Sequence, residues 1–468
     1  MTIHKRWCAV ALCAGLGLAM AASACSSKTA GEGSSASPGA AGQVTLTVTG
    51  LLPGSTTAAY QGLADQVSAF EAANPGIRVI TMDYEWKATT FAADLAGGTL
   101  PDVFEIPFTD GKTLIANQQI ADLNQYIKQF PYDGGFNPNV LQYGQGTDGD
   151  VYAIPAKSIY GVGLHYNRDL FTKAGLDPDK PPTTWDEVRA DAKAIAATGA
   201  AGFCQMSNNG TGGWQLTVDT YARGGRMETV DSAGKATATL DNAATKASLQ
   251  YLQTLRWTDN SMGSTFMYDW GSINQAFAAG QCGMYTSGQD VYTSLVQSNA
   301  MNPDMYGLTM IPLEGADSGV LGGGTLAAVS VKDTDAQKAA AVKWISYYYL
   351  GRYASQEAAV TAAKLSLANN QPVGVPELPI FSDANLAQYE QWVKPYVNVP
   401  LDHMTGFTDK IGAATLINEP PVATQDVYAA LDPVVQAVLT DRNADIDALL
   451  TTANTAAQRA IDRAQTAS

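Results

Sequence analysis

Apolar and polar residues follow strand and helix periods in turn along this chain. Over residues 44–48 apolar positions alternate with threonines, which is typical of a strand with one buried face. Apolar residues then recur three and four apart over 63–70, as on the buried face of a helix, until Asn74-Pro75-Gly76 ends it. Two further strands are predicted over 77–80 and 103–106. A strand, a helix and a strand in this order predict a right-handed parallel crossover, and the continuing alternation predicts an α/β fold.

The length and charge of the chain narrow the classes of partner. A chain of 468 residues is long enough to form two lobes with separate hydrophobic cores. Its formal net charge of -16 at pH 7 would repel the phosphates of nucleic acids, so no nucleic-acid partner is expected. A neutral small molecule is not repelled by that charge.

The N-terminus carries a targeting signal. Two basic residues precede an apolar run over 7–22, which is shorter than the roughly 20 residues that a bilayer-spanning helix needs. Residues 1–24 are therefore predicted to be a signal peptide, and the small residues before Cys25 resemble a lipoprotein processing site. Lipidation of Cys25 would anchor the protein to the cell membrane through residues 25–43, a Gly/Ser/Ala-rich flexible tether. Ordinary cleavage and free secretion is the alternative.

Two cysteines, Cys204 and Cys282, remain in the chain after Cys25. Outside the cytoplasm such a pair forms a disulfide if the two Cα atoms lie close enough, and otherwise the residues are two buried thiols. Their spacing matches no metal-binding motif, so no metal site is expected there.

One stretch of the sequence resembles a known family closely. It comprises residues 149–155 (GDVYAIP), 166–171 (YNRDLF) and 182–187 (PTTWDE). These motifs are similar to a segment of the extracellular sugar-binding proteins of ABC importers, the bacterial family 1 solute-binding proteins, which include maltodextrin-binding protein. Other segments resemble the same family, in the same order, over most of residues 44–350, at positions 70–79, 101–104, 275–284 and 322–345.

The resemblance implies a two-lobed, periplasmic-binding-protein-like fold of type II, with a hinge and a ligand cleft between the lobes. The parts are expected at these positions: lobe 1 at 44–158 plus 320–372, lobe 2 at 159–319 plus 373–468, and crossings near 157–160, 317–320 and 371–376. The function implied is capture of a neutral sugar, a di- or oligosaccharide, by closure of the hinge, followed by delivery to the permease subunits of an ABC importer. The protein would act outside the cytoplasm as a monomer, without catalysis, cofactor or metal, and would meet the membrane only through its lipid anchor.

A sugar site needs aromatic rings and hydrogen-bonding groups for hydroxyls, and five residues are first candidates. Phe108, Thr109 and Asp110 follow a predicted parallel strand, where open sheets bind ligands, and by resemblance this loop contributes polar contacts. Asp110 is the preferred acceptor, although Thr109 or Asp110 could equally cap a helix. Tyr160 lies at the first crossing, where the family places a ligand contact, with hinge packing as the alternative. Trp214 follows a glycine-rich loop that by resemblance presents an aromatic platform, with a core position as the alternative.

Five further residues complete the candidate set. Trp86 opens a predicted helix after the second strand. Asp290 occupies a place where many relatives have tryptophan, so a hydrogen-bonding role is expected there in place of stacking. Trp270 could supply the missing ring, and a core position is an equally weighted alternative. Gly323 and Gly324 suit backbone that approaches a ligand closely, and would offer it their amides.

Two rival functions remain open. A binding protein for a non-sugar solute has the same fold, and Tyr347-Tyr348-Tyr349 invites comparison with ferric-ion binders that use a tyrosine pair. Because consecutive helical residues point in different directions, packing is the favoured role of this run. A secreted sugar-processing enzyme would need a pair of carboxylates such as Glu105 and Asp110, whose separation the sequence does not fix.

Overall fold

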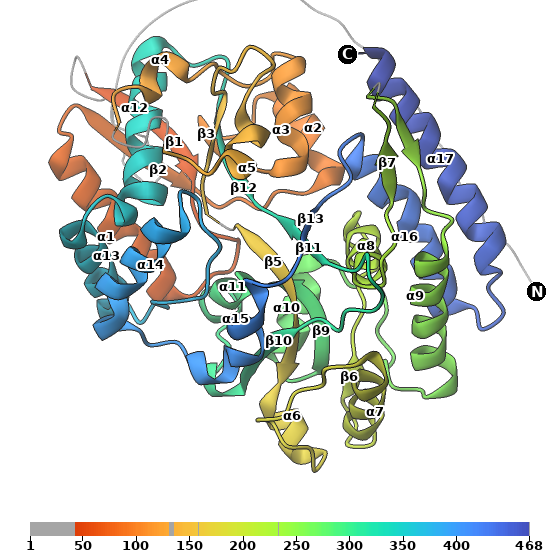
Figure 1. Ribbon diagram of the computed structural model, residues 1–468. Helices are drawn as coiled ribbons and strands as arrows, with labels where there is room; N and C mark the ends of the chain where they lie inside the picture. Colours follow the sequence, from red (N-terminus) through yellow and green to blue (C-terminus); the bar gives the residue numbers. More distant parts are fainter. Residues whose placement is uncertain (1–42, 131–134, 158, 233, 468) are drawn as a thin grey trace, which may run out of the picture. The chain divides into compact units, whose positions relative to one another are not determined.

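The computed structural model describes residues 43–130, 135–157, 159–232 and 234–467, and the predicted signal peptide, Cys25 and all but the last residue of the tether lie outside these ranges. Within them, no helix is both long enough and apolar enough to cross a lipid bilayer. Two main β-sheets, each with its own hydrophobic core, organise this part of the chain (Figure 1). We call the first core with its sheet lobe 1 and the second core with its sheet lobe 2.

Lobe 1 is built on a five-stranded sheet in the order β2-β1-β3-β12-β4. β1 pairs in parallel with β2 and β3, as strands joined by helical crossovers do, whereas β12 is antiparallel to both β3 and β4. The strands are β1 (Val44–Thr49), β2 (Ile77–Met82), β3 (Val103–Pro107), β4 (Ala153–Pro155) and β12 (Thr325–Val329).

Lobe 2 is built on a six-stranded sheet in the order β13-β11-β5-β9-β6, with β10 also paired to β5. β5 is antiparallel to β9, β10 and β11, and all of its residues after the first are buried, as in a sheet with both faces covered. The strands are β5 (Tyr160–Asn167), β6 (Ala201–Phe203), β9 (Cys282–Gly288), β10 (Tyr306–Met310), β11 (Val320–Gly323) and β13 (Leu416–Asn418).

Helices flank both sheets. Those associated with lobe 1 are α1 (Thr57–Ala73), α2 (Ala88–Gly97), α3 (Phe108–Ala116), α4 (Asn124–Ile127), α5 (Pro138–Leu141), α12 (Asp335–Ile345), α13 (Gln356–Ala368) and α14 (Asp383–Val393). Those associated with lobe 2 are α6 (Arg168–Lys173), α7 (Trp185–Ala196), α8 (Thr211–Ala222), α9 (Ala243–Gln253), α10 (Trp270–Ala278), α11 (Val291–Gln297), α15 (Thr405–Ile411), α16 (Thr424–Thr440) and α17 (Ile446–Ala467).

The predicted α/β class is confirmed, and local sequence explains the first unit well. β1, α1 and β2 occupy the predicted positions, and Thr56 caps α1 by accepting a hydrogen bond from the backbone of Ala59 (3.3 Å). Trp185, at the start of α7, is buried behind a capping box formed by Thr184 and Glu187. These local signals determine where the helices begin, and the apolar faces of the elements determine how they pack.

Two crossings between the lobes lie side by side as neighbouring strands. The first joins β4 to β5 and ends at Tyr160, as predicted. The second joins β11 to β12 at Gly324, and Gly323 before it is paired with Tyr160. The expected crossing at 317–320 is corrected, because β11 still belongs to the lobe 2 sheet. Gln289 of lobe 2 stabilises the chain just after the first crossing, because its Oε1 accepts from the Gly161 N–H (2.8 Å).

The third crossing lies later in the chain than expected. Val373 and Val393 both belong to the lobe 1 core, so α14 is part of lobe 1, and Val399 is the first buried residue of the lobe 2 core after it. The change of lobe therefore falls between α14 and Val399, and not at 371–376. Asn398 ties the two segments together, since its Oδ1 accepts from the Val373 N–H (2.7 Å) and its Nδ2 donates to the Gln371 carbonyl (3.0 Å).

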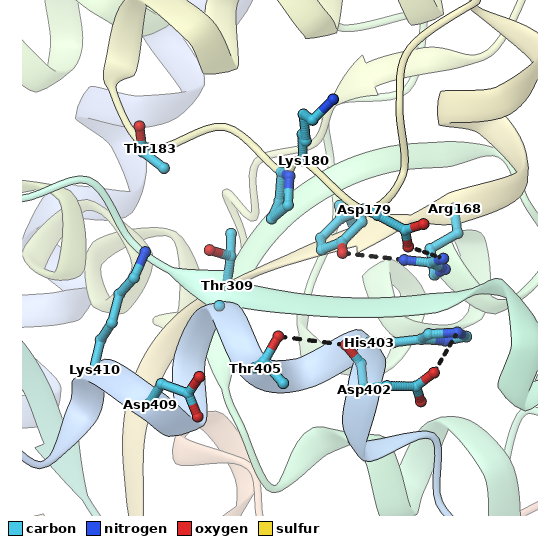
Figure 2. Close-up of a pocket in the computed structure, with 13 residues that line it drawn as sticks. Arg168, Asp179, Lys180, Thr183, Thr309, Asp402, His403, Thr405, Asp409 and Lys410 are labelled. Atoms are coloured by element: carbon cyan, nitrogen blue, oxygen red, sulfur yellow. Dashed lines mark hydrogen bonds and ion pairs between the residues drawn. The ribbon is translucent and has the colours of Figure 1, made fainter.

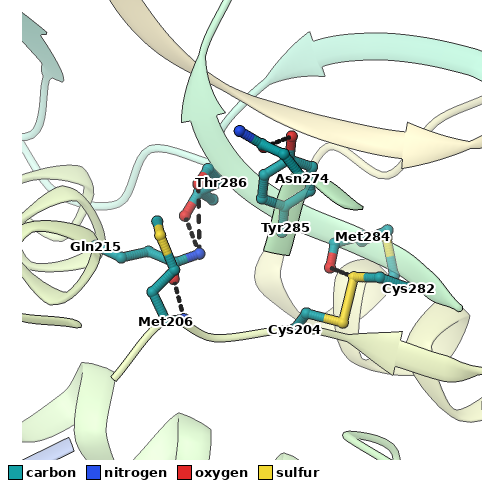
Figure 3. Close-up of a disulfide and its surroundings, with 8 residues drawn as sticks. All are labelled: Cys204, Met206, Gln215, Asn274, Cys282, Met284, Tyr285 and Thr286. Atoms are coloured by element: carbon teal, nitrogen blue, oxygen red, sulfur yellow. Dashed lines mark hydrogen bonds between the residues drawn. A yellow bond between two sulfur atoms is a disulfide. The ribbon is translucent and has the colours of Figure 1, made fainter. Parts of the chain in front are cut away.

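Cys204 and Cys282 form a disulfide, with their Cα atoms 6.1 Å apart (Figure 3). The bond joins the segment after β6 to the first residue of β9, and these two strands are parallel neighbours. Gln215 of α8 lies beside this region, where its Oε1 accepts from the Met206 N–H (2.6 Å) and its Nε2 donates to Thr286 Oγ1 (3.1 Å). The disulfide and this buried amide both hold the segment after β6 against β9.

A two-stranded ribbon of β7 (Glu228–Val230) and β8 (Ala236–Ala238) packs against the C-terminal helix α17. Side-chain amides of α17 accept from the outward N–H groups of this segment. Gln465 accepts from Ala236 (3.1 Å), Gln458 from Ala238 (2.8 Å), and Asn454 from the Leu240 N–H (2.8 Å).

Candidate ligand site

The start of α3 brings Phe108 to the second crossing. The Phe108 N–H donates to the Gly324 carbonyl (2.9 Å), and its ring covers Gly324 so closely that a side chain there would overlap it. Tyr143 stacks on the other side of the Phe108 ring, with centroids 4.6 Å apart. Phe108 is only 5% exposed, so its ring supports the crossing from within lobe 1.

Asp110 lies in the first turn of α3, next to Trp86. The Trp86 indole Nε1 donates to Asp110 Oδ2 (3.1 Å), and the Thr109 hydroxyl donates to Oδ1 (3.4 Å). Burial raises the pKa of Asp110 to about 7, and the hydrogen bonds from Trp86 and Thr109 oppose that rise. The hydroxyl of Tyr84 is also buried near this carboxyl, without a hydrogen-bond partner among the described residues.

Lobe 2 contributes two aromatic rings, Tyr160 and Trp214. Their centroids are 6.3 Å apart and the rings meet edge to face. Trp214 lies on the first turn of α8, which begins after Gly210 in the left-handed conformation (φ 79°), and both rings are partly buried. Gly323 lies directly against the Tyr160 ring, and a methyl group there would overlap the phenol hydroxyl.

Glu419 joins this group, although the sequence analysis did not single it out. It follows β13, and a methyl group at Gly323 would come within 3.0 Å of its Oε2. The Tyr428 hydroxyl donates to Glu419 Oε1 (2.9 Å). Burial raises the pKa of Glu419 to about 7, and the charge of Asp110 adds to the rise, while Tyr428 and the Trp214 indole favour the ionised form. The charge of the lobe 1 carboxyl group therefore acts on the carboxyl group of lobe 2.

Hydrogen bonds connect the two lobes away from the crossings. Gln425, on the first turn of α16, donates through Nε2 to Thr109 Oγ1 (2.8 Å). Elsewhere the Thr56 N–H donates to the Gln297 carbonyl (2.7 Å). The first contact places the start of α16 beside the start of α3, next to both carboxyl groups.

Asp290 lies close to the group of rings and carboxyl groups, whereas Trp270 packs elsewhere in lobe 2. Burial raises the pKa of Tyr160 well above its usual range, and the charges of Glu419 and Asp290 add to the effect, so Asp290 lies close to the phenol. Trp270 begins α10 and packs partly against the lobe 2 core. The structure thus groups eight of the ten predicted residues with Glu419 and Gln425, places Asp290 near Tyr160, and places Trp270 against the lobe 2 core at the start of α10.

Glu105 is held apart from this group by its own partners. Lys157 pairs with Glu105 Oε2 (2.7 Å), and the Tyr349 hydroxyl donates to Oε1 (2.7 Å). The rest of the tyrosine run packs through its rings, with Tyr348 stacked on Trp344 at 4.9 Å. These contacts favour structural roles for Glu105 and for the tyrosines, in line with the packing role expected for that run.

A separate hollow of about 720 Å³ lies in lobe 2, and none of the candidate residues lines it (Figure 2). Its wall carries charges of both signs, including the ion pair between Arg168 and Asp179 (2.6 Å). Lys180 and Lys410 also reach it. A broad, open wall of mixed charge, with Tyr166 and His403 as its aromatic rings, lacks the convergent groups of a sugar site.

Residues 53–350 match the family model described as bacterial extracellular solute-binding protein. The sn-glycerol-3-phosphate-binding periplasmic protein UgpB of Yersinia pseudotuberculosis is 22% identical over 284 residues, which are 58% of this chain and 63% of that protein. The alignment therefore spans less than two thirds of that relative.

Solved structures share the fold over nearly the whole chain. An ABC transporter solute-binding protein from Thermotoga lettingae, bound with alpha-D-tagatose, has a TM-score of 0.70 at 17% identity, with 90% of this chain and 100% of that chain covered. Maltose-bound MalE3 of T. maritima has a TM-score of 0.66 at 19% identity, with 88% and 98% covered. At these identities the likeness establishes the type II fold alone.

Proposed function

The chain belongs to the bacterial extracellular solute-binding protein family, and from this premise we propose that it captures a di- or oligosaccharide between its lobes and delivers it to the permease of an ABC importer. The observation that carries the proposal is the group of rings and carboxyl groups at the crossings. Trp86 and Asp110 come from lobe 1, and Tyr160, Trp214 and Glu419 from lobe 2. Aromatic faces suit the C–H faces of sugar rings, and carboxyl oxygens accept from their hydroxyls.

The same carboxyl groups argue against a phosphate ester as the ligand, although UgpB is named for one. Among the described residues, neither Asp110 nor Glu419 has a lysine, arginine or histidine nitrogen within 4.0 Å. A phosphate about 4 Å from one carboxylate would be repelled by about 4 kcal/mol at an effective dielectric constant of about 20. Sugars lack that penalty, which supports a carbohydrate over a phosphorylated ligand.

Hinge closure is the mechanism we propose for capture. The paired crossings would bend together, because Gly323 lies opposite Tyr160 where the antiparallel strands β11 and β5 pair. A ligand that contacts Asp110 from lobe 1 and Trp214 from lobe 2 would stabilise the form in which the lobes meet. Capture without covalent change follows from this mechanism, and we infer no catalytic step.

We further propose that the protein works outside the cytoplasm as a monomer, tied to the membrane through a lipid on Cys25. The family is extracellular by its description, which supports the location. Mass spectrometry of the membrane fraction tests the anchor. A diacylglyceryl group on an N-terminal Cys25 is the expected result, and an unmodified cysteine released into the medium would contradict it.

A thermal-shift screen with calorimetry tests the function. At a ligand concentration of about 100 times Kd, binding stabilises the protein by about 2.7 kcal/mol, which is readily seen as a higher Tm. We expect at least one saccharide to raise the Tm and sn-glycerol 3-phosphate to leave it unchanged. A rise with glycerol 3-phosphate alone would overturn the proposal.

A further inference from the structure

Asp110 and Glu419 accept hydrogen bonds only from neutral side chains among the described residues. Asp110 is held by the Trp86 indole and the Thr109 hydroxyl, and Glu419 by the Tyr428 hydroxyl. Glu105, by contrast, is neutralised by Lys157 at 2.7 Å. Two partly buried carboxyl groups therefore come from segments of different lobes that the Gln425–Thr109 hydrogen bond holds together, and among the described residues neither has a lysine, arginine or histidine nitrogen within 4.0 Å.

Burying such a pair is costly in the absence of a counter-charge. Ionised carboxyls that leave water need paired cations or several hydrogen-bond donors, and otherwise they take up protons. Both groups here respond in that way, since burial raises the pKa of each to about 7. A ligand that supplies a positive charge would let both carboxylates ionise and would gain two charge-assisted hydrogen bonds.

The rings around the carboxyl groups also suit a cation. Tyr160 and Trp214 meet edge to face, and the charge of Glu419 is felt at the phenol of Tyr160. Gly323 lies beside both Tyr160 and Glu419, because a methyl group there would press on the Tyr160 phenol and on Glu419 Oε2, so the Tyr160 ring and the carboxyl group meet at this crossing. An ammonium group over a tryptophan or tyrosine face is attracted by the ring quadrupole, most strongly where water is excluded.

We propose that the preferred ligand is an amine-bearing carbohydrate, with its ammonium group held between the carboxylates of Asp110 and Glu419 and beside the rings of Tyr160 and Trp214. The proposal rests on the proposed function and narrows its substrate class from a neutral sugar to an amino sugar or amino oligosaccharide. It assigns Asp110 and Glu419 as the residues that determine this specificity. The rest of the sugar would use the polar groups nearby, including the buried hydroxyl of Tyr84.

Matched sets of sugars test the proposal. Within each set the rings and the linkage are the same, and the sugars differ only at C2 of each ring, which carries an amine, an acetylated amine or a hydroxyl. Suitable sets are glucosamine, N-acetylglucosamine and glucose, the corresponding galactose derivatives, and chitobiose, N,N′-diacetylchitobiose and cellobiose. Calorimetry at pH 7 should give at least about tenfold tighter binding for the amine than for its hydroxyl counterpart.

Two isosteric variants test whether Asp110 and Glu419 determine the preference for the amine. Glu419→Gln and Asp110→Asn should each reduce the preference for the amine over the hydroxyl sugar, because an amide offers no net charge, and the two substitutions together should bring it to near unity. Glu357→Gln removes an exposed carboxylate of α13 and should leave the preference as it is. Retained melting behaviour of each variant checks that it folds.

The possible outcomes distinguish the amine proposal from the sugar-capture proposal on which it rests. If hydroxyl or acetylated sugars bind as tightly as the amines, or if the variants keep the preference, the amine proposal is overturned and the sugar-capture proposal stands. If no sugar of any kind raises the Tm, both are overturned.

Discussion

Replacing Glu419 with glutamine should stabilise the ligand-free protein near pH 8 and leave its stability almost unchanged near pH 4.5. The carboxyl lies beside Gly323 and accepts from Tyr428, contacts that an amide of the same shape preserves. What the substitution removes is the charge, which burial disfavours.

The magnitude follows from the pKa of Glu419, which burial raises from 4.5 to about 7. Between these two values the folded protein binds more protons than the unfolded chain, so the free energy of unfolding falls as pH rises. One group contributes a slope of up to about 1.4 kcal/mol per pH unit. Integrated from 4.5 to about 7, the ionised carboxylate costs about 3 kcal/mol, and the loss is complete above pH 7.

Urea unfolding at pH 4.5, 6 and 8 measures this difference. Glu419→Gln should match the parent protein at pH 4.5 and exceed it by about 2–3 kcal/mol at pH 8. The control variant Glu357→Gln changes an exposed side chain of α13 and should differ from the parent protein by the same amount at all three pH values. The reasoning is refuted if Glu419→Gln is less stable than the parent at pH 8, or if its advantage is independent of pH.

Three other substitutions probe the hinge, the rings and the disulfide. Trp214→Ala should weaken sugar binding roughly tenfold or more in calorimetry with the fold intact, because the ring that we propose as a sugar platform is lost. Unchanged affinity would remove Trp214 from the proposed site. The Cys204→Ser, Cys282→Ser double variant should lose about 4.5 kcal/mol of unfolding free energy, since a loop spanning 78 residues is released; equal urea midpoints would contradict this. Gly323→Ala should weaken binding roughly tenfold or more, because its methyl displaces the packed phenol, whereas Gly76→Ala meets nothing within 4 Å and is the control.

Short-range patterns were enough to predict much of the fold. The alternation at β1, the helical period of α1 and the stop at Asn74 all lie within a few residues of one another in the chain. The crossings were harder, because they depend on which sheet a strand joins. β11 reads as a strand in either lobe, and only its pairing with β5 and β13 places it in lobe 2. The position of α14 likewise depends on packing against lobe 1, which no local signal encodes.

The candidate site was also predicted only in part, because some of its residues have local sequence signals and others meet only through long-range packing. Asp110 and Trp214 stand next to recognisable landmarks, a strand end and a glycine-rich loop. Glu419 and Gln425 lie in the C-terminal part of the chain, where the resemblance to the family was loose. Gln425 meets Thr109 across 316 residues of sequence, and such a contact leaves no periodic trace. Only the proline pair after Glu419 hinted at a fixed turn there.

The side-chain amides of α17 that accept from the β8 segment have a consequence for aggregation. A two-stranded ribbon with a bare edge is a template on which a second polypeptide can add a strand, and from which aggregates grow. Asn454, Gln458 and Gln465 occupy those donor positions with side chains, which cannot propagate a ladder. Helix α17 therefore protects this edge from pairing with a second polypeptide. A chain truncated before α17 is expected to aggregate even if the residues of its candidate ligand site are intact.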